Sequence, residues 1–380
     1  MRPHGRLRLL FVVLAVTAAT AGLCQDRTAV DLPTGVRAVW DMEQAHREIT
    51  PTRERICING LWRWQPAGDA GDVVPADNWG YFKVPGCWPG LSNWMQKDCQ
   101  TLHAHPSWQD DDLRRVAAAW HQREITIPDE WAGRRIALSA EYLNSYAVVH
   151  VDGERVGEIR FPGGEVDLTS VCRAGGRHVL SMMVVAMPLK AVMLSYNATA
   201  SARQVRGTVQ RRGLCGDVHL VATPAGARIG DVKVDTSVRN SEIAIEAGLE
   251  DLAADGSYVL RALISDAGRD VAEFTSEEFR AGDLEAGRIA FTESWLPDRL
   301  WDIHTPANMY DLSLSLLDGG GGVLDTGHTV RFGFREFWIE GRDFYLNGSR
   351  LFLSAVPLDN AQISAWTASY EVARESMLRL

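Results

Sequence analysis

Short runs of alternating apolar and polar residues fill most of the chain, from about residue 59 to residue 332. Examples are the stretches AWHQREITIPDEW at 119–131 and SYAVVHVDGERVGE at 145–158, and Gly, Pro and Asp-Gly punctuate them. A period of two residues is typical of half-buried strands, and frequent turn residues are typical of antiparallel sandwiches. The pattern therefore predicts a mainly β protein.

The strand patterns divide into two predicted units, 50–223 and 224–332. In the first, the Asp152-Gly153 pair predicts a tight hairpin, because both residue types tolerate positive φ. The second contains seven candidate strands, at 229–236, 242–249, 258–264, 271–275, 288–292, 312–317 and 323–332. Seven strands at this spacing favour an immunoglobulin-like sandwich. The four glycines at 319–322 are interpreted as its last hairpin loop, since no helix follows to make a phosphate site.

The hydrophobic pattern changes after residue 332. Glu336–Ile339 and Phe344–Leu346 predict a hairpin, Asn347-Gly348 predicts a tight turn, and Leu351–Val356 predicts a buried strand. From Thr367 onward apolar residues recur at a helical period, which predicts a helix still open at Leu380.

The first 23 residues have the composition of a secretory signal peptide. Basic residues precede an apolar stretch at 9–16, and the small residues Ala19 and Ala21 suit cleavage. The stretch is shorter than the ~20 apolar residues that span a bilayer, so no membrane span is predicted. We expect export to the periplasm, cell surface or extracellular space. Lipidation at Cys24 stays open, although Leu23 occupies a position where lipoprotein signals have a small residue.

Composition narrows the classes of partner. With 46% hydrophobic residues in 380, the chain can form two or three cored domains, and its net charge of -10 without a basic cluster argues against nucleic acid. The 13 tryptophans are expected mostly in the core, where large aromatics are usually buried. The oligomeric state stays open.

Cysteine and histidine give no strong site. The remaining cysteines are irregularly spaced, so at most one disulfide, such as Cys87–Cys99, is considered, and its pairing stays open. His103 and His105 lie near the acidic run 110–112 but supply only part of a ligand set. They are interpreted as a polar loop, and no metal or cofactor is predicted.

Particular phrases resemble glycoside hydrolase family 2, the β-galactosidase and β-glucuronidase group. They are GLCGDV at 213–218, GFRE at 333–336 and FYLNGSRLFL at 344–353. The resemblance implies a jelly-roll (galactose-binding-like) sandwich, an immunoglobulin-like β-sandwich and then a (β/α)8 TIM barrel. Residues 333–380 would hold only the first β/α unit of a truncated barrel.

The resemblance also implies where the chemistry lies. Retaining enzymes of this family use two glutamates on later barrel strands, and a barrel takes about 250 residues. Only 48 residues run from 333 to 380, so no catalytic residue is predicted here. Asp359 and Asn360 follow the predicted strand 351–356 at the end where barrels bind substrate. They are the candidate substrate-binding residues, with an ordinary loop as the alternative.

Three positions differ from the family pattern. The first barrel strand reads SAVPLD at 354–359 without the usual Arg and His, and Gly207 and Leu102 replace an acidic residue and an Asn that face the sugar in many members. These differences argue against a lactose-type β-galactosidase.

Two functions follow from the sequence. The first is the N-terminal part of an exported glycoside hydrolase that cleaves O-glycosidic bonds of a carbohydrate substrate by the retaining two-glutamate mechanism. The alternative is a non-catalytic carbohydrate-binding or surface-adhesion protein made of two β-sandwiches. A helix open at Leu380 favours the first, because a finished binding protein is expected to end on a closed element.

The predicted signal peptide can be tested directly. Protein recovered from the exported fraction should lack Cys24 and every residue before it, because a signal peptide is removed on export. Intact-mass spectrometry measures this, and a mature protein that starts at Met1 would contradict the prediction.

Overall fold

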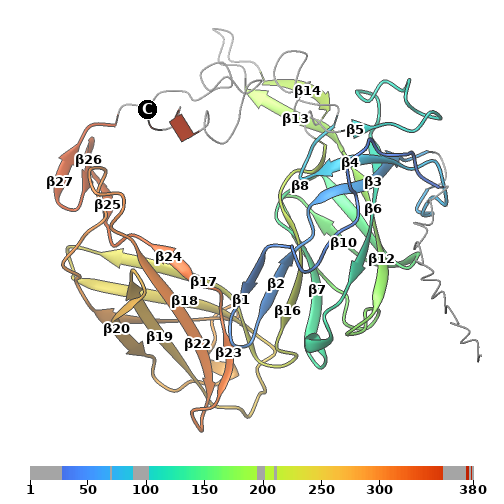
Figure 1. Ribbon diagram of the computed structural model, residues 1–380. Helices are drawn as coiled ribbons and strands as arrows, with labels where there is room; N and C mark the ends of the chain where they lie inside the picture. The colour runs from blue at the N-terminus through green and yellow to red at the C-terminus, as the bar shows by residue number, and fades with distance from the viewer. Residues whose placement is uncertain are drawn as a thin grey trace, which may run out of the picture.

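The computed structural model describes residues 28–68, 71–88, 102–194, 202–208, 212–353, 374–375 and 378, with the backbone alone at 188–194 and 202–208. Two β-sandwiches lie side by side, and a small three-stranded sheet extends from the second (Figure 1). The mainly β fold predicted from the alternating pattern is confirmed. The predicted signal peptide lies outside the described residues. Within those residues, no helix has the length and apolarity needed to cross a membrane.

The first sandwich consists of two antiparallel sheets. Its five-stranded sheet has the order β1-β2-β16-β7-β11, and its seven-stranded sheet has the order β10-β9-β12-β6-β3-β4-β5. The strands are β1 (Arg47–Ile49), β2 (Glu54–Cys57), β3 (Gly60–Pro66), β4 (Gly80–Val84), β5 (Leu102–His103), β6 (Ala118–Thr126), β7 (Arg135–Ala140), β9 (Tyr146–Val151), β10 (Glu154–Arg160), β11 (Gly164–Asp167), β12 (Arg177–Val185) and β16 (Val218–Thr223).

Two further strand pairs belong to this part of the chain. They are β8 (Leu143–Asn144) with β15 (Gly213–Leu214), and β13 (Pro188–Leu194) with β14 (Ala202–Thr208). Short 3-10 helices occur at Asp129–Trp131 and Ala281–Asp283.

Tryptophan dominates the space between these two sheets. Trp64 packs at 5.3–5.7 Å, measured between ring centroids, against Phe82, Trp88 and Trp108. Among the residues that the structure describes, seven tryptophans are buried: Trp62, Trp64, Trp79, Trp88, Trp108, Trp120 and Trp131. The expectation that tryptophan forms core is confirmed for these seven. Burying so many large rings contributes strongly to stability, since each removes well over about 100 Å² from water.

The second sandwich has its own apolar core. A three-stranded sheet, β17-β18-β21, faces a sheet in which β22 pairs with β19, β23 and β24, and β20 pairs with β19. The bounds are β17 (Arg228–Ser237), β18 (Glu242–Glu250), β19 (Tyr258–Asp266), β20 (Arg269–Thr275), β21 (Arg288–Ser294), β22 (Tyr310–Asp318), β23 (Val323–Thr326) and β24 (Val330–Phe332).

The predicted strand at 323–332 is two strands instead of one. Gly327 leaves the ladder after β23 and its N–H donates to the Leu314 carbonyl, and the chain rejoins β22 as β24. The glycine-rich loop at 319–322 joins β22 to β23, as the sequence predicted. The Asp318 carboxylate accepts the N–H groups of Gly320 and Gly322 at 2.9 and 2.8 Å, so the loop's donors are satisfied internally.

The third sheet follows residue 332 and contains β25 (Phe337–Glu340), β26 (Asp343–Leu346) and β27 (Ser349–Leu351). The predicted Asn347-Gly348 turn joins β26 to β27 with φ of 49° and 87°. The structure differs from the predicted buried strand at 351–356 over residues 351–353, the part that is described. The strand ends at Leu351, and the side chains of Phe352 and Leu353 are 91% and 51% exposed.

The remainder of the predicted barrel entry lies largely outside the described residues. Residues 354–373 are among those not described, and of the predicted helix only Arg374, Glu375 and Leu378 are described, in helical conformation. Within the described residues, no closed barrel is formed.

A buried ion pair joins the two sandwiches. Arg53, which precedes β2, directs its guanidinium at Asp325 of β23: Nε donates to Oδ1 and Oδ2 at 2.8 and 3.1 Å, and Nη2 also donates to Oδ2. Arg53 is 8% exposed and Asp325 is not exposed. We call Arg53 and Asp325 the inter-sandwich clamp. In Figure 1, β1 and β2 lie beside β23 at this junction.

Neighbouring groups complete the hydrogen bonds of the clamp. The Ile229 N–H and the Thr52 hydroxyl donate to the two Asp325 carboxylate oxygens at 2.7 and 2.8 Å. The Thr326 N–H donates to Thr52 Oγ1 at 2.8 Å, and the Thr50 hydroxyl donates to the Thr326 carbonyl at 2.8 Å. The two buried charges therefore face each other directly, and further donors satisfy the remaining carboxylate lone pairs.

Removing one partner of the clamp should be strongly destabilising. We expect Asp325→Ala to lower the free energy of unfolding by about 3–5 kcal/mol, because it leaves the Arg53 charge buried and unpaired. Urea denaturation followed by tryptophan fluorescence measures the loss. The control is Asp255→Ala, which removes an exposed carboxylate from the same sandwich.

The double variant Arg53→Met with Asp325→Leu should recover most of the loss, since replacing both charges by apolar groups is often near neutral. A loss in Asp325→Ala no larger than in Asp255→Ala would show that the pair does not stabilise the junction.

Candidate functional site

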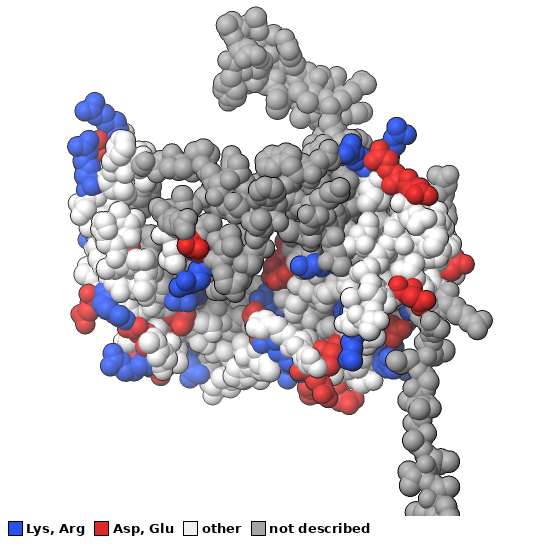
Figure 2. All heavy atoms as spheres, turned by 45° about the horizontal axis from the view of Figure 1, so that its top comes forward, with Lys and Arg blue, Asp and Glu red and all other residues white. Residues whose placement is uncertain are grey.

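The two residues predicted to bind substrate, Asp359 and Asn360, lie outside the described residues, so their role stays a prediction. Basic and acidic side chains are interspersed over the described part of the face shown in Figure 2. Candidate chemistry therefore has to be sought in hollows and in buried polar groups.

The histidines considered from sequence do not form a ligand set among the described residues. The ring Nδ1 of His105 lies 2.8 Å from Ser107 Oγ and accepts the Ser107 N–H. This local turn agrees with the polar-loop interpretation for His105, whereas His103 lies in β5, opposite Tyr81 of β4. No metal-ligating group of three that includes His103 or His105 occurs in the described part of the chain.

A different group of potential ligands lies on the five-stranded sheet. Side-chain ligand atoms of Glu141, Asp217 and His219 lie within 4.8 Å of one another. Asp217 already accepts a hydrogen bond from Asn59 Nδ2 at 2.8 Å, and Glu141 lies 3.6 Å from the Arg55 guanidinium. A cation bound here would be held beside the charge of Arg55, so we assign no metal to this group.

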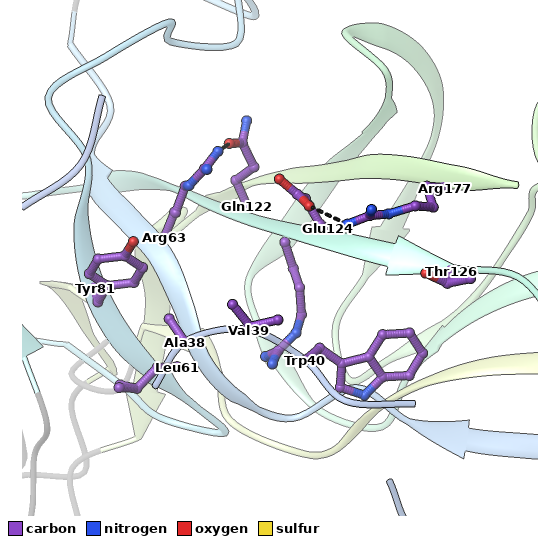
Figure 3. Close-up of a pocket in the computed structure, with 11 residues that line it drawn as sticks. Ala38, Val39, Trp40, Leu61, Arg63, Tyr81, Gln122, Glu124, Thr126 and Arg177 are labelled. Atoms are coloured by element: carbon purple, nitrogen blue, oxygen red, sulfur yellow. Dashed lines mark hydrogen bonds and ion pairs between the residues drawn. The ribbon is translucent and has the colours of Figure 1, made fainter. Parts of the chain in front are cut away.

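A cavity of about 270 Å³ opens on the seven-stranded sheet where the chain segment 38–40 crosses it (Figure 3). β3, β4, β6 and β12 supply its walls. Its lining combines two aromatic side chains, three arginines and other polar groups: Ala38, Val39, Trp40, Leu61, Arg63, Tyr81, Gln122, Arg123, Glu124, Thr126 and Arg177.

Hydrogen bonds organise the rim of this cavity. Arg63 Nη1 donates to Gln122 Oε1 at 2.7 Å, and Arg177 Nη2 donates to Glu124 Oε2 at 3.3 Å, the two pairs drawn in Figure 3. Trp40 is held over the sheet by its indole Nε1, which donates to the Cys57 carbonyl at 3.1 Å. The rim thus offers an aromatic face beside paired charges.

Arg123 differs from the other two arginines. It is 6% exposed, and its Nε and Nη1 have no hydrogen-bond partner among the residues that the structure describes. Burial lowers the pKa of Arg123 to about 10, which still leaves the guanidinium charged at neutral pH. Sequence reasoning did not single out Arg123. The available signal was its position in the alternating pattern. Arg123 is a charged residue between His121 and Ile125, on the same face of β6 as the buried Ile125.

A second polar cluster anchors the sheet β25-β26-β27 to the second sandwich. The Glu336 carboxylate accepts hydrogen bonds from Arg239 Nε at 2.7 Å, the Arg239 N–H at 2.9 Å and the Ser237 hydroxyl at 3.2 Å. The Arg239 guanidinium also lies 4.2 Å from the ring centroid of Trp338, which stacks on Tyr345. Glu336 therefore fixes the start of β25 to the end of β17.

The acidic residues of this region pair with arginines distant in sequence or on another strand, and not with their near neighbours Arg335 and Arg342. Glu336 pairs with Arg239, and Asp343 pairs with Arg350 at 2.7 Å. Arg335 instead places its guanidinium 4.4 Å from the ring centroid of Trp301. The sequence could not show that β17 brings Arg239 to this place.

Residues 227–335 match the model of glycosyl hydrolases family 2. The chain is 23% identical over 317 residues to a β-glucuronidase of Paenibacillus borealis, an alignment that covers 80% of this chain and 49% of that protein. It is 23% identical over 314 residues to a β-glucuronidase of Bacteroides fragilis, covering 75% and 41%.

Solved structures show the same fold. The β-glucuronidase of Bifidobacterium dentium complexed with coumarin-3-O-glucuronide aligns with a TM-score of 0.58 at 23% identity, over 80% of this chain and 51% of that one. The β-D-glucuronidase of Dictyoglomus thermophilum aligns with a TM-score of 0.56 at 20% identity, over 81% and 48%.

Fold and sequence together define a protein of successive β-sandwiches. The chain is similar to proteins of glycoside hydrolase family 2, as its sequence motifs predicted. It spans about half the length of the curated relatives that it matches.

We call the hydrogen-bonded cluster of Glu336, Arg239 and Ser237 the Glu336 anchor. It should make the stability of the chain depend on pH. The hydrogen bond from Arg239 holds the pKa of Glu336 below its ordinary value of 4.5. A depressed carboxyl pKa stabilises the folded state above the unfolded pKa, and this contribution is lost as the pH falls through the folded pKa. The difference in melting temperature between wild type and Glu336→Gln should be largest above about pH 5 and shrink toward pH 3.

Thermal melts from pH 3 to 7 measure this difference. In an Arg239→Met background the same substitution should have a smaller effect, because the hydrogen-bonding partner is gone. A difference that is constant across the range would show that the Glu336 charge plays no part in the anchor.

Proposed function

We propose that this chain is the N-terminal part of a glycoside hydrolase that cleaves O-glycosidic bonds by the retaining two-glutamate mechanism, with both catalytic glutamates outside it. The observation that carries the proposal is the alignment of 80% of this chain with about half of a β-glucuronidase. The aligned part consists of β-sandwich domains, and the family's reaction takes place in a barrel.

The carboxylates of Glu336 and Asp343, which lie near the predicted barrel entry, do not have the properties of a catalytic pair. A retaining glycosidase needs two carboxyl groups about 5–5.5 Å apart, one of them able to hold a proton at neutral pH. Glu336 and Asp343 are each bound to an arginine, Arg239 and Arg350 respectively. The hydrogen bond from Arg239 holds the pKa of Glu336 below its ordinary value, so Glu336 does not suit the acid role.

The two sandwiches then serve as a support for the barrel. The inter-sandwich clamp fixes their relative orientation. The Glu336 anchor fixes the sheet β25-β26-β27, from which the chain continues. Positioning of this kind matters for catalysis, because misplacing a substrate-binding group by about 1 Å can cost about 100-fold in rate.

The relatives also suggest a first substrate to test. Those matched by sequence are β-glucuronidases, so β-glucuronides are the proposed class, with Asp359 and Asn360 as proposed substrate contacts. We further propose that the protein is exported, on the composition of its first 23 residues.

Turnover measurements test the proposal. The purified 380-residue chain should hydrolyse no nitrophenyl β-glycoside above background, because it lacks the acid and nucleophile that the reaction needs. The same coding sequence, extended past Leu380 through a complete barrel, should hydrolyse 4-nitrophenyl β-glucuronide.

The matched control is the extended protein with each barrel glutamate changed to Gln, which should lose activity. Two results would contradict the proposal. One is an inactive extended protein, and the other is activity of the 380-residue chain that vanishes on changing Glu336, Glu340 or Asp359.

A further inference from the structure

Arg123 is a buried cation without a counter-ion among the described residues. Its neighbours on β6 explain how it came to be buried. Ala119 and Ile125 on the same strand belong to the apolar core, and Arg123, two residues before Ile125, faces the same side because strand side chains alternate. Burying a charge without a partner is strongly unfavourable, so its retention here needs an explanation.

The immediate surroundings hold the guanidinium in place but do not neutralise it. Its central carbon lies 5.6 Å from the ring centroid of Trp62, a cation–π contact. A Cβ at Gly60 would lie 3.3 Å from both Nη1 and Nη2, so the close approach to β3 depends on a glycine there. The nearby Cys57 thiol stays uncharged, because burial raises its pKa.

Arg123 lines two adjoining cavities. One is the cavity of about 270 Å³ described above, and the other, of about 310 Å³, lies on the side of residues 41–46. Val39, Trp40 and Leu61 also line both. The unpartnered cation therefore lies where a small molecule can enter under the segment 38–40.

The remaining lining is suited to a sugar ring. Trp40 and Tyr81 offer flat apolar faces, and Thr126 offers a hydroxyl group. The Gln122 amide is already engaged with Arg63 and with the Ser181 hydroxyl. The other two arginines of the cavity are engaged on its rim, Arg63 with Gln122 and Arg177 with Glu124. A ligand that carries both a carboxylate and hydroxyl groups would satisfy Arg123 and use the aromatic faces.

We propose that this cavity is a second, non-catalytic binding site for a uronic acid sugar, whose carboxylate pairs with Arg123. The inference that the ligand carries a carboxylate depends only on the burial of Arg123 and on its missing partner. The sugar class rests on the proposed function, because the similar proteins are β-glucuronidases. The site lies on the seven-stranded sheet of the first sandwich.

Isothermal titration of the 380-residue chain with sodium glucuronate tests the proposal without any turnover. Glucuronate should bind at least about tenfold more tightly than glucose, which lacks the carboxylate, since a charge-assisted hydrogen bond is roughly twice as strong as a neutral one. Raising the salt concentration should weaken glucuronate binding and leave glucose unaffected.

Substitutions assign the effect to Arg123. Arg123→Met should weaken glucuronate binding by at least about tenfold, and Arg123→Lys should weaken it less, because a lysine keeps the charge but not the planar donor set. Arg177→Met is the matched control: it removes an arginine of the same cavity that Glu124 already neutralises, and binding should change by less than about threefold.

A purely structural role for Arg123 predicts a different result. If the residue acts only by packing on Trp62, Arg123→Met should lower the melting temperature and glucuronate should not raise it in wild type. Should Arg123→Met fail to fold, Leu61→Trp narrows both cavities from a half-buried position and should also abolish binding.

Equal affinity for glucuronate and glucose, or unchanged binding in Arg123→Met, would overturn the proposal. Sulfate that binds as tightly as glucuronate would overturn the sugar class. If glucuronate binds as expected while the barrel-extended protein is inactive, the proposed glycosidase function fails and the anion site stands. If the barrel-extended protein is active while glucuronate does not bind to the 380-residue chain, the anion site fails and the glycosidase function stands.

Discussion

The inter-sandwich clamp is the interaction on which the arrangement of this protein depends. A single carboxylate, Asp325, receives donors from both sandwiches: the Arg53 guanidinium and Thr52 hydroxyl from one, and the Ile229 backbone from the other. Because these groups are buried, rotating one sandwich against the other would leave a charge in the interior without a partner. Each sandwich has its own apolar core, so the clamp contributes orientation more than it contributes folding of either unit.

Orientation also matters where the chain leaves the second sandwich for the sheet β25-β26-β27. There the Glu336 anchor repeats the same principle with a more exposed arginine, Arg239. A glycosidase must hold two carboxylates and a sugar ring in a fixed geometry. Two sandwiches whose orientation is fixed by a buried ion pair would give the proposed barrel a stable reference.

Local sequence signals predicted much of this fold. Asp152-Gly153 and Asn347-Gly348 form the expected turns at positive φ, and the strands of the second sandwich follow the alternating pattern closely. These features depend on residues a few positions apart. The strand predicted at 323–332 was wrong in one respect, because the break at Gly327 depends on its hydrogen bond to Leu314 of a neighbouring strand.

The polar contacts were beyond the reach of sequence reasoning. Arg53 and Asp325 are 272 positions apart, and nothing local indicates that they meet. Glu336 and Arg239 are 97 positions apart, so the sequence alone does not indicate that they pair. Arg123 was overlooked for a related reason: only the structure shows that its neighbours provide no counter-ion.

Small-angle X-ray scattering tests the central claim, that matched buried charges hold the two sandwiches in one orientation. The wild-type chain and Asp325→Ala should be compared under conditions where both remain folded by circular dichroism. The account predicts that the wild-type curve fits one arrangement of the two sandwiches and that Asp325→Ala gives a larger radius of gyration and a broader distance distribution. Superimposable curves for the two proteins would contradict it.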